Sequence, residues 1–394
     1  MRVPRQSHVP GVDGLRCLAV GAVILFHAHV FRMGWAGVWL FFVISGFVIT
    51  RSLRADIAAG LPASEVFRQF YLKRSFRILP LYLGAVLIFS LMISSFSADR
   101  GEKLQHLPYL LTFTYNFYRL GSAYIHNDYF GHFWSLSVEE QFYLVYPTLL
   151  ILLGATRLSR ALLIGLIAVP LIRLIVSLAY GAATPAASVP DLAAWRGNAV
   201  YQLSIAQFDA FACGALIALN ETRICAARFA LPAIAGLALA ALIIYAALYG
   251  ALFGGLAEAF RVNLYGYYGE IWLYSVVDLV AAALLVAVLT GWRPLLWLCT
   301  LRAARYIGRI SFGIYVIHFP MMEVVGERSR PFLQQLFERQ GLSFLDNPVT
   351  YLMLFGGLTI FLAHLSYSHY ERPMMRLGRR LLGRSEPAAA STAI

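Results

Sequence analysis

Long runs of apolar residues alternate with short polar connections along almost the whole chain. A transmembrane α-helix needs about 20 predominantly apolar residues, and ten stretches meet this requirement. They lie near residues 15–32, 35–53, 78–97, 132–154, 158–180, 200–220, 229–254, 270–290, 306–326 and 348–370. The pattern predicts an all-α integral membrane protein, a bundle of about ten transmembrane helices. We expect residues 1–384 to form one membrane domain and residues 385–394 a disordered tail.

The distribution of charge changes this picture by giving the bundle an orientation. Charged residues are 13% of the chain and hydrophobic residues 60%, whereas soluble proteins carry about 25% charged residues. With a cytoplasmic N-terminus, the inner connections hold more than twice as many Lys and Arg residues as the outer ones, as the positive-inside rule requires. This distribution predicts a protein of the inner membrane whose two termini are cytoplasmic. It also assigns the net charge of +12 to contact with membrane lipids, and we expect no nucleic acid as a partner.

Two ionisable side chains lie inside the first apolar stretch, where a charge at the bilayer centre costs about 2.5–3.5 kcal/mol. Arg16 and His27 are eleven residues apart. At about 100° per residue they share one helix face, and they stand about 16 Å apart along the helix axis. This spacing predicts a functional stripe with a cation near the inner surface and an imidazole near the outer surface.

A pair of carboxylates, Glu139 and Glu140, lies near the outer end of the fourth stretch, which runs antiparallel to the first. We expect them at the depth of His27, with Glu139 favoured as its partner. A His beside a carboxylate in a low-dielectric site is a general base with an orienting group. The spacing Ser137-x-x-Glu140 also fits a capping box, which would need no chemistry.

A basic cluster of Lys73, Arg74 and Arg77 lies at the inner end of the third stretch. Lys and Arg bind phosphate groups, Arg through a bidentate fork. Two interpretations stay open, namely a topology signal that faces lipid headgroups or a set that holds an anionic cytoplasmic co-substrate. The spacing of the four cysteines matches no metal site, and we expect no metal.

Six segments in order, from about Gly11 to Arg380, together resemble the membrane-bound acyltransferase-3 family. They are VDGLR at 12–16 with His27 after a gap of ten residues, FFVISGF at 41–47, KRSFRILP at 73–80, WSLSVEEQFY at 134–143, ISFGIYVIH at 310–318 and YERP at 370–373. One departure is Lys73, which stands where many members have Arg.

The resemblance implies an O-acyltransferase that moves an acyl group, usually acetyl, from cytoplasmic acyl-CoA to a hydroxyl. Family acceptors are mostly polysaccharide, lipopolysaccharide or peptidoglycan sugars, and in some branches macrolide-type products. The residues that we assign to catalysis are His27, Glu139 and Glu140. Those assigned to acetyl-CoA as co-substrate are Arg16, Lys73, Arg74 and Arg77, and those assigned to the acceptor are Trp134, Asn116 and His318.

The expected mechanism has His27, oriented by Glu139, deprotonate a hydroxyl that attacks the thioester. A covalent acyl-histidine intermediate is the alternative within the same class. A proton-coupled transporter is the alternative in another class, because carriers use buried ionisable residues as relays, although the sequence shows no internal repeat. A scaffold protein would leave the buried charges unexplained. The sequence does not fix the acceptor, the acyl chain length or the oligomeric state.

Overall fold

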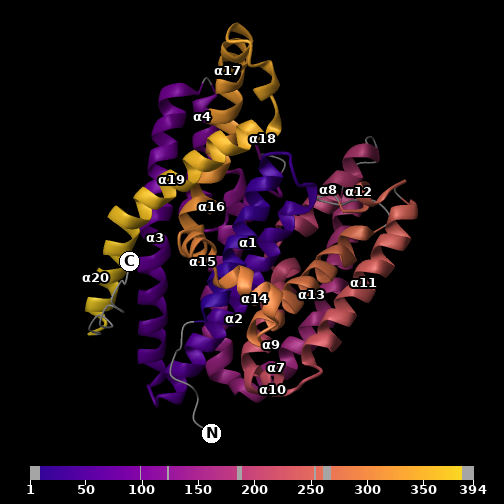
Figure 1. The fold of residues 1–394 in the computed structure, drawn as a ribbon. Helices are drawn as coiled ribbons and strands as arrows, with labels where there is room; N and C mark the ends of the chain where they lie inside the picture. The colour runs from indigo at the N-terminus through magenta and orange to yellow at the C-terminus, as the bar shows by residue number, and fades with distance from the viewer. Residues whose placement is uncertain are drawn as a thin grey trace.

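The computed structural model describes residues 9–97, 99–121, 124–183, 189–252, 254–260 and 268–383. The regular structure in these ranges is helical throughout (Figure 1). Seven helices there are long and apolar enough to cross a membrane, or eight if one bent pair forms a single span. The prediction of an all-α multi-pass membrane protein is confirmed. The predicted tail at 385–394 lies outside the described residues.

The helices follow one another along the chain with short connections. In the first half they are α1 (Pro10–His27), η1 (Arg32–Ala36), α2 (Gly37–Ala58), α3 (Ala63–Phe96), α4 (Arg100–Leu104), α5 (Leu107–Leu111), α6 (Tyr115–Tyr118), η2 (Gly131–Phe133), α7 (Trp134–Ala183), α8 (Val189–Gln202), η3 (Ser204–Gln207), α9 (Phe208–Leu219) and α10 (Glu221–Ala226). In the second half they are α11 (Ala230–Leu252), α12 (Leu256–Ala259), α13 (Gly269–Leu289), α14 (Arg293–Thr300), α15 (Arg302–Arg309), α16 (Ser311–Pro320), η4 (Met321–Gly326), α17 (Glu327–Arg339), η5 (Ser343–Leu345), α18 (Pro348–Tyr351), η6 (Leu352–Gly356), α19 (Gly357–Ser366), η7 (Tyr367–Glu371) and α20 (Arg372–Leu381).

The predicted count of about ten spans exceeds the seven or eight helices that are long and apolar enough for three reasons. Helix α7 contains the fourth and fifth stretches as two helices that meet at a kink at Gly154, where φ is 67°, so the predicted boundary between these stretches lies at the observed break. The sixth stretch is bent by 75° between 196–202 and 204–219. The ninth stretch is divided among α15, α16 and the π-helical η4. The apolar pattern did not show these last two breaks.

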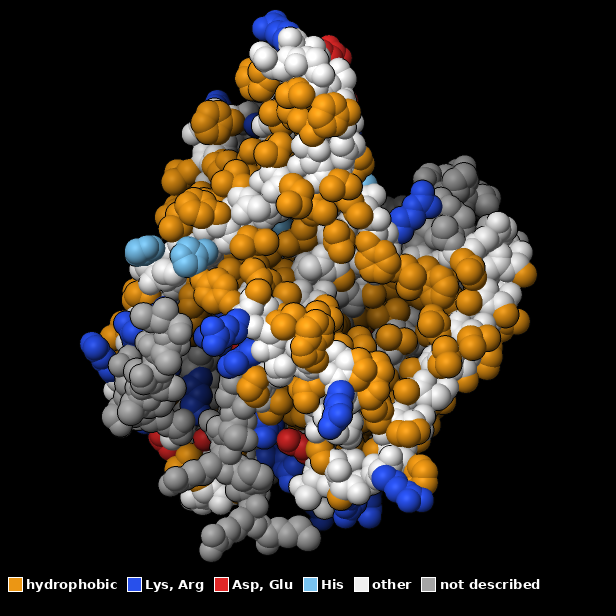
Figure 2. Space-filling view, viewed as in Figure 1, with side chains coloured by type: hydrophobic (Ala, Val, Ile, Leu, Met, Phe, Trp, Pro, Cys, Tyr) orange, Lys and Arg blue, Asp and Glu red, His pale blue; other side chains and the backbone are white. Residues whose placement is uncertain are grey.

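The surface of the bundle matches a lipid environment. Hydrophobic side chains cover most of the middle of the face in Figure 2, and Lys and Arg gather mainly toward its lower part, where α10 and the N-terminal end of α1 lie in Figure 1. Many large apolar side chains are exposed, such as Leu152 and Ile167 of α7 and Leu239 of α11. An exposed apolar surface of this extent is stable against lipid and not against water.

The centre of the bundle depends on a close crossing of α2 and α9. A Cβ atom at Gly214 would lie 1.8 Å from the carbonyl oxygen of Val43, and one at Gly46 would lie 2.1 Å from that of Phe211. Both positions therefore require glycine, and the two backbones meet as in other membrane helix pairs with small residues at the contact. The crossing fixes α2, which supplies residues to the candidate site.

A buried ion pair joins α7, α9 and α13. The Nη2 atom of Arg173 donates to Oδ1 of Asp209 at 2.6 Å, and neither side chain is more than 2% exposed. Arg173 also donates to Ser275 and to the backbone oxygens of Ala206 and Ile271. Since each buried charge is met by its counter-charge and by hydrogen bonds, this network is structural, and these residues need no role in transport.

The connection between α3 and α7 is packed around an imidazole. The ring of His106 lies within 6 Å of the rings of Tyr115, Tyr118 and Tyr124. Its Nδ1 atom is 3.1 Å from the hydroxyl oxygen of Tyr115. Burial lowers the pKa of His106 to about 4, so the ring is neutral near pH 7. These aromatic residues of the connection therefore pack against one another.

The crossing of α2 and α9 gives a first test. Gly214→Ala should lower stability by about 1–3 kcal/mol, because the added methyl group forces the two helices apart. The control is Gly165→Ala in α7, where a Cβ atom would meet nothing within 4 Å. Thermal melting of the purified protein in detergent measures both changes, and equal melting temperatures for the two variants would contradict the close-packing argument.

Candidate active site

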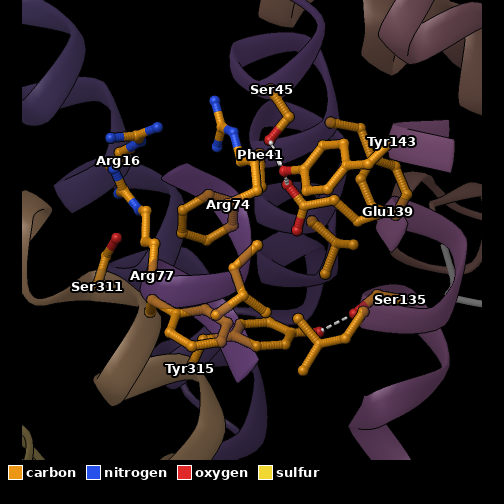
Figure 3. A pocket seen from close by; sticks show the side chains of 15 residues that line it. Arg16, Phe41, Ser45, Arg74, Arg77, Ser135, Glu139, Tyr143, Ser311 and Tyr315 are labelled. Carbon is orange, nitrogen blue, oxygen red and sulfur yellow. Dashed lines mark hydrogen bonds between the residues drawn. The ribbon is translucent and has the colours of Figure 1, made fainter. Parts of the chain in front are cut away.

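A cavity lies between α1, α2, α3, α7 and α16 and encloses ≈ 600 Å³ of empty volume (Figure 3). We call it the inner cavity. Apolar side chains such as Phe41, Phe42 and Ile78 form part of its wall. Its polar lining consists of Arg16, Ser45, Arg74, Arg77, Ser135, Glu139, Tyr143, Ser311 and Tyr315. The segments 12–16, 41–47, 73–80, 134–143 and 310–318 of the sequence thus each contribute to one cavity.

Three guanidinium groups point into this cavity. Arg74 and Arg77 lie three residues apart on α3, so the helix repeat places them on one face, and Arg16 reaches the same space from α1 (Figure 3). The only carboxylate among the described lining residues is Glu139. Asp13 adds a second, 3.8 Å from Arg16. The lining therefore carries an excess of positive charge, which a phosphate-bearing ligand would neutralise.

Glu139 belongs to the inner cavity, where it accepts hydrogen bonds from the hydroxyls of Ser45 and Tyr143. The guanidinium carbon of Arg74 lies 5.3 Å from the Tyr143 ring centroid. The structure therefore does not bring Glu139 and His27 together, contrary to the sequence-based expectation. The fourth span begins at Gly131, within one residue of its predicted start, so the difference lies in the face of α7 that carries Glu139, which is turned toward Ser45 of α2.

Glu140 lines neither this cavity nor the one that contains His27. Its predicted role as a capping-box residue also fails. Helix α7 begins at Trp134, so Ser137 lies inside the helix, and its hydroxyl donates to the backbone oxygen of Phe133.

The carboxylate next to His27 is Glu323, from η4. The Nδ1 atom of His27 lies 3.4 Å from Oε1 of Glu323, and the two side chains are 18% and 32% exposed. The imidazole also packs against the rings of Phe319 and His318, with centroid distances of 4.9 and 5.1 Å. Sequence reasoning missed Glu323, although an acidic residue inside the apolar stretch 306–326 was the available signal.

Two further imidazoles stand beside this pair with defined tautomers. Nδ1 of His318 is 2.6 Å from the backbone oxygen of Tyr315, and Nε2 of His132 is 3.1 Å from that of Val316. A carbonyl only accepts, so each of these nitrogens carries the proton in the neutral ring. The opposite nitrogens, Nε2 of His318 and Nδ1 of His132, are buried and have no hydrogen-bond partner among the described residues. His318, assigned to the acceptor from sequence, does lie next to His27.

His27 itself lines a second cavity, which we call the outer cavity, and the two cavities share no lining residue. At one side of the inner cavity the hydroxyls of Ser135 and Tyr315 are hydrogen bonded at 2.5 Å (Figure 3). His318 follows Tyr315 by three residues on α16, so this hydrogen bond stands between the arginine cluster and the imidazoles.

Three other predicted site residues lie outside both cavities. Lys73 donates to Oδ2 of Asp56 at 2.9 Å. The ring of Trp134 packs against the ring of Tyr201 at 4.4 Å. Asn116 donates to Ser204 at 2.9 Å, inside the protein. In the part of the chain that the structure describes, no group of three or more His, Cys, Asp and Glu residues has the arrangement of a metal site.

Comparison with known proteins shows which family the chain matches and which proteins it is similar to. An acyltransferase domain matches residues 9–367. The Bacillus subtilis (strain 168) protein named "Putative peptidoglycan O-acetyltransferase YrhL" is 28% identical over 411 aligned residues, which cover 97% of this chain and 57% of that protein. The Listeria monocytogenes "Peptidoglycan O-acetyltransferase OatA" is 31% identical over 159 residues, which cover 37% of this chain and 25% of that protein. No solved structure matches the chain.

The chain thus spans little more than half the length of the Bacillus relative. The matched domain contains every lining residue of both cavities. It also contains the motifs at 12–16, 41–47, 73–80, 134–143 and 310–318 on which the resemblance rests. The chain belongs to the acyltransferase-3 family of membrane proteins.

Proposed function

We propose that the protein is a membrane O-acetyltransferase that moves an acetyl group from acetyl-CoA to a hydroxyl of a carbohydrate acceptor. The observation that carries this proposal is the arrangement along α1. Arg16 lies in a cationic cavity, and His27, paired with Glu323, lies in a second cavity further along the same helix. The names of the relatives support the acetyl group and the carbohydrate class, with peptidoglycan as their printed acceptor.

The donor binds at the inner cavity in this proposal. Arg16, Arg74 and Arg77 supply the guanidinium groups that hold the phosphates of acetyl-CoA. In the orientation that the positive-inside rule predicts, this cavity faces the cytoplasm. The pantetheine arm then extends along α1 toward His27, over the separation of about 16 Å between the two α1 residues. The Ser135–Tyr315 hydrogen bond has to open for the thioester to pass.

The chemical step uses His27 as the general base. With the proton on Nδ1, which lies 3.4 Å from Oε1 of Glu323, the Nε2 lone pair takes the proton of the acceptor hydroxyl. The oxygen attacks the thioester carbonyl carbon, the carbon–sulfur bond breaks, and the imidazolium returns the proton to the leaving thiolate. Glu323 stabilises the imidazolium during this step. An acyl-His27 intermediate is the alternative route, and trapping of acylated histidine in a single turnover distinguishes the two.

The first prediction concerns the base. His27→Ala should lower acetyl transfer by about 10²–10⁴-fold, the usual contribution of a positioned base. The control is His369→Ala, since His369 is exposed on η7 and lines neither cavity. Transfer from labelled acetyl-CoA by folded, purified protein in detergent measures both. Wild-type turnover in His27→Ala would remove the catalytic assignment.

The second prediction separates the two candidate partners of His27. Glu323→Gln should lower kcat by about tenfold, equivalent to about 1.4 kcal/mol of transition-state stabilisation, with little change in the KM for acetyl-CoA. Glu139→Gln should instead lower that KM, because removing the negative charge increases the positive excess beside the three arginines. Glu338→Gln, on the exposed end of α17, is the control. The reverse pattern of kcat and KM effects would restore Glu139 as the orienting group.

The third prediction tests the donor site. Arg16→Ala and Arg77→Ala should each raise the KM for acetyl-CoA by about tenfold, because a charged hydrogen bond to phosphate contributes about 1.5–3 kcal/mol. The matched control is Arg157→Ala, an exposed arginine of α7 outside the cavity. Steady-state kinetics and CoA binding by calorimetry supply the measurements. Unchanged CoA affinity in both cavity variants would exclude this donor site.

A further inference from the structure

We propose that the outer cavity is a saccharide-binding site in which Tyr351, Arg330 and Glu327 select the acceptor, an inference that rests on the proposed function and names its acceptor subsite. The cavity encloses ≈ 590 Å³ of empty volume. Its lining includes His27, Glu327, Arg330, Tyr351 and Phe355. A ligand in it therefore contacts both the base and the α17–α18 hairpin.

The hairpin of α17 and α18 forms the outer wall of this cavity. In Figure 1 it stands at the top of the bundle, beyond the end of α1 at which His27 lies. Glu327 and Arg330 lie on the first turns of α17, and Tyr351 ends α18. An acceptor that enters between these elements meets their polar groups first and the imidazole of His27 at the end of its path.

Two π-helical segments, η4 and η6, contribute to the same cavity. Met322 and Gly326 come from η4, and Leu352 and Phe355 come from η6. Single π-helical turns are rare inside α-helices and occur frequently at functional sites. Two of them in one cavity indicate that its shape is maintained against the intrinsic preference of the backbone.

Tyr351 is a rigid, flat part of the wall. Its ring is parallel to that of Phe355, with an interplanar angle of 1°. Its hydroxyl donates to Oδ1 of Asp346 at 3.0 Å. The side chain of Asn347 caps α18 by accepting from the backbone nitrogens of Val349 and Thr350. A fixed aromatic ring suits the apolar face of a sugar ring, because little side-chain entropy is lost on binding.

The polar groups beside Tyr351 complement sugar hydroxyls. The guanidinium carbon of Arg330 lies 5.1 Å from the Tyr351 ring centroid, and its Nη1 atom is 3.5 Å from Oε1 of Glu327. Arg330 offers donors and Glu327 offers acceptors, and each hydroxyl of a saccharide can use both. A largely apolar macrolide would leave these groups without partners, so the wall favours a saccharide.

The test is equilibrium binding of a labelled β-1,4-linked tetrasaccharide of N-acetylglucosamine to the full chain in detergent. Arg330→Ala and Tyr351→Ala should each weaken binding by about tenfold or more, the loss that accompanies removal of a satisfied hydrogen bond or a stacked ring. Tyr351→Phe keeps the ring and should bind within about threefold of wild type. Arg339→Ala, at the exposed far end of α17, should bind as wild type does.

Two further results complete the test. Equal binding by wild type, Arg330→Ala and Tyr351→Ala, or no binding by the wild type, would overturn the inference. Acetyl transfer to the same tetrasaccharide is measured in parallel, with the KM for acetyl-CoA as the donor readout. A protein that binds the saccharide through Arg330 and Tyr351 but consumes no acetyl-CoA would contradict the proposed function while leaving the saccharide site in place.

Discussion

The cost of an ionised side chain in hydrocarbon determines where the polar residues of this protein lie. Arg173 and Asp209 are almost completely buried and satisfy each other, so their charges cancel inside the bundle. In the inner cavity three arginines surround one carboxylate, Glu139. The Arg173–Asp209 pair is structural because its charges are balanced, whereas the inner cavity has an excess of positive charge. Only the arginines of the inner cavity therefore gain stabilisation from an anionic ligand.

The fold was predictable to the extent that the length of apolar runs determines it. The pattern identified every long helix of the bundle and the multi-pass membrane class. It placed a boundary at Gly154, where the structure has a kink, but it did not show that the sixth stretch would bend or that 306–326 would be divided by a π-helical turn. These breaks depend on the packing of neighbouring helices, and packing is not encoded in the hydropathy of a single segment.

The candidate site was predictable along α1 and less so between helices. One helix fixes the spacing of Arg16 and His27, and each lines a cavity as the stripe suggested. Pairing Glu139 with His27 required the rotation of a second helix about its axis as well as its depth, and the apolar pattern gave the start of that span to within one residue but not the face that Glu139 turns to α2. Glu323 was missed because a π-turn interrupts the 100° repeat that relates side chains to faces.

The π-helical turn η4 also determines how the helix responds to a change in chain length within residues 321–326. A π-turn contains one residue more than an α-turn, so η4 sets the rotational phase between α16 and α17. Loss of a single residue within 321–326 would convert the π-turn into an α-turn and leave the helix beyond it close to its present phase. Glu327 and Arg330 would then keep their places at the outer cavity. The same loss in an ordinary α-helical turn would rotate everything beyond it by about 100°, so this joint tolerates a deletion that would misplace the site elsewhere along the helix.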